Sequence, residues 1–273
     1  MRTRSIVTLA PSATCPPCAW LVSPSRRGRS CERGLTMGLT IHWTLDAGDI
    51  PVAQARAKVR QLYDIARRLP FQRVWPIDDL RGDACDYDKN PDEDLQWLPI
   101  QARHTVFVER PDGRYSVVVM PRAVIAFTAD PGDGSETASF GLCRYPKTIM
   151  FKGTRIPTGV DGWHWHSFCK TQYASDPAHG GTQNFLKCHL VVIALLRHAE
   201  EMGLVTEVYD EGDYWDKGDV RALAQEVGEW NTMIAGFAGL LKDALSDTSV
   251  TLEAPILSRQ DFEHLEAQAR ATA

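Results

Sequence analysis

The sequence has few cysteines outside its first residues, and it has no long hydrophobic run. Seven cysteines occur in 273 residues, and three of them fall within the first 36: Cys15, Cys18 and Cys31. The other four are scattered, as in proteins of a reducing compartment: Cys85, Cys143, Cys169 and Cys188. We therefore expect a cytoplasmic protein without a disulfide framework. No stretch approaches the roughly 18 apolar residues that read as a membrane-spanning helix, so we expect no membrane partner.

Basic side chains are also scarce beyond the first 36 residues. The whole chain has 30 Lys and Arg against 35 Asp and Glu, whereas residues 37–273 have 24 against 34. Phosphate backbones need a basic surface for most of their affinity. The composition therefore disfavours nucleic acid as a partner.

Residues 1–36 differ from the remainder in carrying six arginines, four prolines and one acidic residue. Their apolar stretches are shorter than the roughly 7 to 15 residues of an export signal, although the composition also fits an organelle transit peptide. We favour a third interpretation, in which translation begins at Met37, because a strand pattern follows it at once. We predict a disordered extension over 1–36 and a single globular domain over 37–273.

Sequence motifs of common ligand sites are incomplete. Pro91 replaces the turn glycine of an EF-hand loop and Trp97 replaces its closing glutamate. Five other residues match calcium-ligand positions of that loop: Asp86, Asp88, Asn90, Asp92 and Asp94. No phosphate-binding loop or dinucleotide fingerprint is present. We expect a solvated acidic loop over residues 83–94.

Periodic hydrophobic patterns predict the main elements. Alternation predicts strands over 39–45, 105–109, 115–120, 124–129, 137–145 and 205–209. Spacings of three and four predict helices over 51–69, 183–202 and 220–245. We therefore expect an α+β fold, an antiparallel meander of about five or six strands with one N-terminal and two C-terminal helices packed on it.

The most reactive window is residues 159–216, where Trp163-His164-Trp165-His166 alternates. In a strand, both imidazoles then point to one face and both indoles to the other. Two histidines with a carboxylate form a common metal site. We expect His164, His166 and Asp210 to hold a divalent metal such as zinc.

A chemical role follows for the neighbouring polar residues. We expect His166 and Glu211 to act as acid and base, and Lys170 and Tyr173 to contact the substrate. Three alternatives stay open: a Cys169 thiolate with His189 as base, an anion site at the glycine-rich start of the 183–202 helix, and a structural role for all these groups.

A basic, aromatic-interleaved patch lies just before this window, with Arg144, Lys147, Lys152 and Arg155 around Tyr145 and Phe151. Such a patch faces an anion or protects an edge strand. Taken together, the sequence suggests a small cytosolic metal-dependent or acid/base hydrolase acting on a small-molecule or anionic substrate. The alternative is a non-catalytic binding protein whose surface is an exposed Trp163, Trp165 or Trp215.

Overall fold

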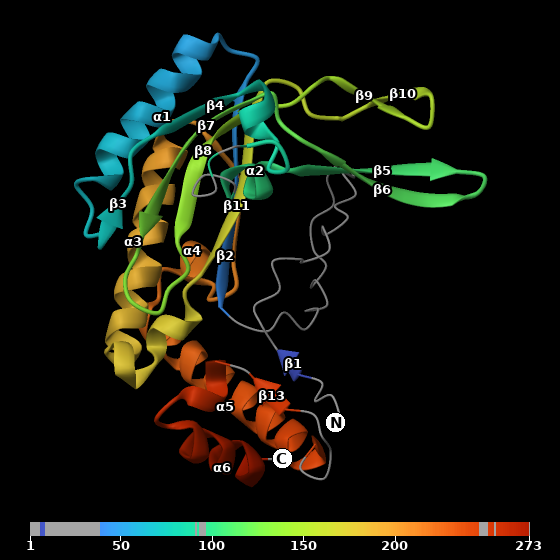
Figure 1. The fold of residues 1–273 in the computed structure, drawn as a ribbon. Helices are drawn as coiled ribbons and strands as arrows, with labels where there is room; N and C mark the ends of the chain where they lie inside the picture. The colour runs from blue at the N-terminus through green and yellow to red at the C-terminus, as the bar shows by residue number, and fades with distance from the viewer. Residues whose placement is uncertain are drawn as a thin grey trace.

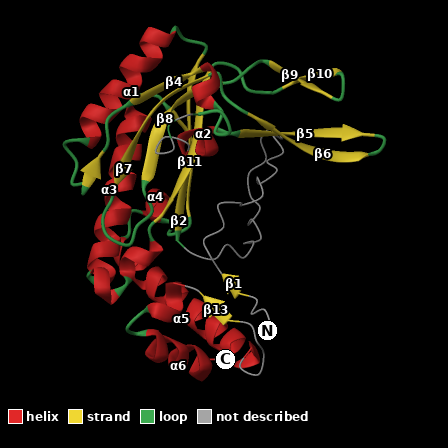
Figure 2. Cartoon of the chain, in the orientation of Figure 1, coloured by secondary structure: helices red, strands yellow, loops and turns green. Residues whose placement is uncertain are grey.

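The computed structural model describes residues 6–8, 39–90, 92, 97–245, 251–253 and 255–272 (Figure 2). The predicted disordered extension over 1–36 and the start at Met37 lie outside these residues, except for the short strand β1 (Ile6–Thr8). That strand pairs in parallel with β13 (Thr251–Glu253).

A seven-stranded antiparallel sheet forms the centre of the fold. Its strands are β2 (Thr40–Gly48), β3 (Arg73–Val74), β4 (Asp78–Arg81), β7 (Ala123–Asp130), β8 (Ala138–Arg144), β11 (Trp163–Lys170) and β12 (Val205–Asp210). The order across the sheet is β12-β2-β11-β8-β7, and both β3 and β4 pair with β7. The α+β class is confirmed, with β2 inserted between β11 and β12 rather than at the start of a meander.

Two long helices cover one face of this sheet, α1 (Val52–Ala66) and α3 (Gly181–Glu201) (Figure 1). Helix α1 begins after Pro51, which suits the start of a helix because its missing N–H needs no partner there. Helix α3 is apolar on most of its surface and is accordingly buried, with Val192, Leu195 and Leu196 at zero exposure. This face is the helix-covered face.

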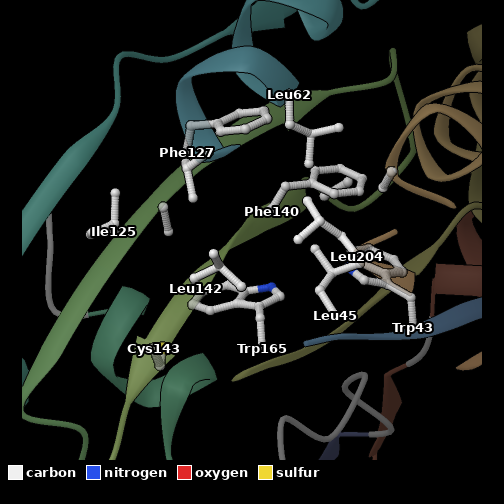
Figure 3. Close-up of a cluster of buried hydrophobic side chains, with 14 of the residues drawn as sticks. Trp43, Leu45, Leu62, Ile125, Phe127, Phe140, Leu142, Cys143, Trp165 and Leu204 are labelled. Carbon is white, nitrogen blue, oxygen red and sulfur yellow. The ribbon is translucent and has the colours of Figure 1, made fainter. Parts of the chain in front are cut away.

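The main core fills the space between these helices and the sheet (Figure 3). The rings of Trp43 and Phe140 stack at 4.9 Å between centroids, and Phe140 in turn stacks on Phe127 at 5.8 Å. Tyr63 of α1 meets Phe127 edge-on at 5.4 Å. Aromatic pairs of this kind add to the free energy gained by burial, and they connect α1 to three strands.

The opposite face of the sheet is covered only in part. The short helix α2 (Trp97–Ala102) and the turn η1 (Gly82–Cys85) lie over β7 and its neighbours, where Val124 and Cys143 are fully buried. On β2, β11 and β12, side chains that point away from α1 and α3 keep partial exposure. We call this part the open face.

Two hairpins project from the sheet instead of extending it (Figure 1). They are β5 (His104–Arg110) with β6 (Gly113–Val119), and β9 (Thr148–Phe151) with β10 (Thr154–Pro157). The predicted hairpin around residues 110–114 is therefore confirmed, but each hairpin is a separate two-stranded sheet and not part of the predicted meander.

The C-terminal helices extend beyond the sheet. After the single turn α4 (Tyr214–Lys217), helix α5 (Val220–Leu245) packs against α3 and then against α6 (Phe262–Thr272). Its far half and α6 enclose a second small core with Ala235, Ala238, Ile256 and Phe262. Only the first of the two predicted C-terminal helices thus packs along the sheet. Among the described residues, no helix has both the length and the hydropathy to cross a bilayer.

Candidate functional site

The alternation of β11 determines which side chains reach the open face. Trp163, Trp165 and Cys169 point into the helix-covered core and are buried, whereas His164, His166 and other even-numbered residues point the other way. The predicted segregation of the two imidazoles from the two indoles is therefore present in the structure.

One row of aromatic rings crosses three adjacent strands of the open face. Phe168 of β11 pairs with His42 of β2, and His42 pairs on its other side with Tyr209 of β12. The His42 ring lies 5.8 Å from Phe168 and 6.0 Å from Tyr209, centroid to centroid. Phe168 is 36% exposed and Tyr209 is 51% exposed. We call these three residues the ring row.

The next row along the strands is polar. His166 of β11 pairs with Thr44 of β2, which pairs with Glu207 of β12. The Thr44 hydroxyl lies 3.3 Å from Nδ1 of His166. These three residues, the polar row, present a hydroxyl, an imidazole and a carboxylate beside the rings.

A further acid–imidazole pair follows at the end of β11. Nδ1 of His164 lies 4.0 Å from a carboxylate oxygen of Asp46, and the His164 side chain is 25% exposed. On the other side of the ring row, Lys170 pairs with Thr40. The ammonium of Lys170 lies 5.1 Å from the centre of the Tyr173 ring.

The imidazoles of the open face favour their neutral forms. Burial, together with a smaller effect of the nearby His166, lowers the pKa of His42 to about 4. Burial also lowers the pKa values of His164, His166 and His104, although Asp46 acts in the opposite sense on His164 and Glu207 on His166. At neutral pH these rings can therefore accept protons or hydrogen bonds.

Asp210 lies on the other side of the sheet from His164 and His166. It pairs with Ile41, a core residue of the helix-covered face, and its carboxylate lies 3.2 Å from Nε2 of His189 on α3. The backbone N–H groups of Gly212 and Trp215 also donate to it at 2.9 Å. The structure therefore does not bring Asp210 together with the two histidines, because a one-residue step along β12 reverses the side chain.

Hydrogen bonds determine the state of this buried carboxylate. Burial raises the pKa of Asp210, but the hydrogen bond and the charge of His189, with the two backbone donors, outweigh burial and hold the pKa below its ordinary value. Nδ1 of His189 lies 3.0 Å from the Thr171 hydroxyl. Thr171 and His189 have zero exposure and Asp210 is 6% exposed, so this hydroxyl–imidazole–carboxylate chain is buried and joins the residue after β11 to α3 and β12.

The remaining predicted residues are separated in the same way. Glu211 accepts a hydrogen bond from the backbone N–H of Thr40 at 2.8 Å and so continues the pairing of β12 with β2. Tyr173 lies in the turn η3 (Gln172–Ser175), beside Lys170. The predicted acid–base pair is separated, because His166 lies on the open face and Glu211 directly follows β12. The carboxylate whose charge raises the pKa of His166 is instead Glu207.

The alternative sites of the sequence have different surroundings. The Cys169 thiol is fully buried and donates to the carbonyl of Glu136 at 3.2 Å, and burial raises its pKa. A thiolate nucleophile is not favoured there. Helix α3 starts at Gly181 without a side-chain cap. Trp163, Trp165 and Trp215 are at most 9% exposed, so they cannot form the predicted tryptophan surface.

Metal ligation has no ready geometry. Within the part of the chain that the structure describes, no group of three or more His, Cys, Asp or Glu side chains is placed to hold a metal ion. The predicted zinc site stays a prediction that the observed rotamers do not support.

Sequence reasoning missed the ring row. The sequence signal for this row was the alternation of residues in the strands at 40–46 and 205–210. It places His42 and Tyr209 on the faces opposite to the buried residues of their strands. The relevant fact was that β2 pairs with both β11 and β12, and no local pattern specifies that pairing. A scan of protein-family models and searches of curated proteins and of solved structures found nothing that matches this chain.

Proposed function

We propose that the protein binds a ligand carrying a flat aromatic ring, and that the open face is the binding surface. The observation that supports this most strongly is the ring row, in which Phe168, His42 and Tyr209 lie side by side on three strands. Exposed rings on a sheet face are a stacking surface for planar ligands, and each stacked base contributes about 1–3 kcal/mol in such sites.

The surroundings of the rings suit the edge of a heteroaromatic ligand. A ring stacked on Phe168 or Tyr209 has its edge within reach of the polar row, where Thr44 can donate and Glu207 can accept. Burial lowers the pKa of His166, so its neutral imidazole offers both a donor and an acceptor. Nucleobases carry both kinds of group and are the ligand class that fits this combination.

Cross-strand packing alone also brings rings together, because neighbouring aromatic side chains stabilise antiparallel pairs. The exposures of Phe168 and Tyr209 distinguish the two roles, since rings that serve only the core are covered, as Trp43 and Phe140 are. Phe168 and Tyr209 keep 36% and 51% exposure, whereas the His42 ring between them is partly buried.

The proposal is tested by calorimetric titration with adenosine monophosphate, with ribose 5-phosphate as a ligand that lacks the ring. We expect Phe168→Ala and Tyr209→Ala each to weaken binding about 5- to 150-fold, from the free energy of one stacking contact. Phe237→Ala removes a similarly exposed ring on α5 and serves as the matched control. Equal binding of both ligands, or no effect of the two variants, would contradict the proposal.

A second candidate function, acid/base hydrolysis, is favoured by one observation. His164 lies 4.0 Å from Asp46, and both groups border the open face. A neutral imidazole oriented by a carboxylate is a general base. We expect hydrolysis of p-nitrophenyl esters or phosphates to be lost in His164→Gln and His166→Gln if this function exists. Metal analysis of the same purified variants tests the metal-dependent form, because bound zinc would decrease in both.

A further inference from the structure

We infer that the ligand of the open face is part of a single-stranded nucleic acid, whose phosphate backbone lies along the two projecting hairpins. This inference rests on the proposed ring-binding function and adds the partner to it. The two hairpins, residues 104–119 and 148–157, are called the hairpin arm.

The two hairpins form one unit because their tips contact each other. A guanidinium nitrogen of Arg110 donates to the carbonyl of Phe151 at 3.2 Å, and the rings of Tyr115 and Phe151 lie 5.4 Å apart. The ammonium of Lys152 lies 3.9 Å from the centre of the Tyr115 ring and 3.3 Å from a carboxylate oxygen of Asp112. These contacts hold the two hairpins of the arm against each other.

Cations lie against aromatic rings on both faces of the first hairpin of this arm. Arg114 lies over the Phe107 ring at 4.3 Å while it pairs with Glu109 at 3.2 Å, and Lys152 contacts two rings. Phe107 is 37% exposed, and Val118 and Met150 are more exposed still. A groove that follows a single strand uses this combination of positive charges with apolar and aromatic contacts.

Charge is segregated between the arm and the rest of the molecule. The arm with its flanks, residues 103–122 and 144–161, has eight Lys and Arg against three Asp and Glu, a formal charge of +5. The whole chain has a formal charge of −5. Positive charge gathered on one part of an otherwise acidic chain favours binding of the phosphate backbone at the arm.

The turn of the second hairpin carries a lysine where the backbone favours another residue. Lys152 has φ 45° and Gly153 has φ 75°, so both central residues of this two-residue turn have positive φ. Such turns prefer asparagine followed by glycine, and a lysine there costs stability. The ammonium of Lys152 thus joins the two hairpins and still leaves its side chain 46% exposed at the tip of the arm.

The arm begins beside the open face. His104 is the first residue of β5, and it lies close enough to His164 and His166 to affect the pKa of His164 and to be affected by His166. Figure 1 shows both hairpins leaving the same end of the sheet. A chain that stacks a base on the ring row would pass the polar row and the His164–Asp46 pair before it reaches the arm.

The test measures fluorescence anisotropy of a labelled 12-nucleotide single-stranded RNA, at several salt concentrations, beside calorimetry with adenosine monophosphate. We expect the RNA to bind at least tenfold more tightly than the mononucleotide and to weaken as salt increases. Lys152→Asn suits the positive φ and removes the charge, and Arg114→Gln removes a second cation. Each should weaken RNA binding several-fold and reduce the salt slope by about 0.7. Neither should change mononucleotide binding.

Lys187→Gln, an exposed lysine on α3, is the control and should leave RNA binding unchanged. If the mononucleotide binds but the RNA binds no more tightly, the inference is overturned while the proposed function stands. RNA binding that is unaffected by both arm variants, or that poly-glutamate displaces as well as unlabelled RNA does, also overturns it. If neither ligand binds, the inference and the proposed function both fail.

Discussion

At the scale of single residues, the alternation of side chains along β11 separates buried core residues from residues that a ligand can reach. Trp165 and Ser167 point into the core, whereas His166 and Phe168 point to the open face. This separation could be predicted from the alternation alone. The partner residues could not, because Asp210 and Tyr209 differ by one position and only the pairing with β2 decides which of them lies beside the histidines.

His42 gives a prediction about stability against acid. Its pKa is about 4 in the folded protein and about 6.5 when unfolded, so protons bind preferentially to the unfolded chain. The contribution of the neutral His42 ring to the free energy of unfolding is therefore fully present above pH 6.5. This contribution is lost as the pH falls from about 6.5 towards 4. At pH 5, the loss from this one residue is about 1–2 kcal/mol.

His42→Phe tests this directly, because phenylalanine keeps a ring in the ring row but does not titrate. Urea unfolding at pH 7 and pH 5 should show a smaller loss of stability for the variant than for the wild type, by about 1–2 kcal/mol. Binding of adenosine monophosphate should persist in the variant. An unchanged difference between the two pH values would show that His42 does not carry the effect.

At the scale of elements, local patterns predicted helices and strands well but not how they associate. The pattern of residues 51–69 specified α1 except for its last turn, and the apolar residues of 183–202 specified a buried helix. The hairpin at residues 110–114 was clear from Pro111, Asp112 and Gly113. Its separation from the main sheet was not, since a strand pattern does not identify its neighbour.

Close packing of β7 on β8 yields a second prediction. A Cβ added at Gly141 would lie 2.4 Å from the Cβ of Ala126 and 2.5 Å from the carbonyl oxygen of Ile125. Because the obstruction includes backbone, the strands must separate. We expect Gly141→Ala to lower the free energy of unfolding by about 2–4 kcal/mol in chemical denaturation.

Gly228→Ala is the matched control for this element. Its added Cβ meets nothing within 4 Å, and it lies within α5. Alanine is about 1 kcal/mol more favourable than glycine in a helix, so this variant should be equally stable or more stable. A cost below about 1 kcal/mol for Gly141→Ala would contradict the packing described for β7 and β8.

At the scale of the whole molecule, average composition concealed the distribution of charge. The acidic balance of residues 37–273 disfavoured nucleic acid as a partner, yet the folded chain gathers eight basic side chains on and around the hairpin arm. Net charge is a sum over a surface, whereas recognition depends on the part of the surface that meets the ligand. Only the pairing of the hairpins shows that Arg110 and Lys152 lie near each other, both beside the ring of Phe151.

The central claim is that the ring row receives a planar ligand, and magnetic resonance of the rings tests it most directly. Protein labelled on its Phe and Tyr rings is titrated with adenosine monophosphate, and Phe168→Leu and Tyr209→Leu assign the two signals. We expect the ring resonances of Phe168 and Tyr209 to shift with ligand concentration, whereas those of Phe237 and Phe151 should not. Saturable binding with the Phe168 and Tyr209 signals unmoved would contradict it.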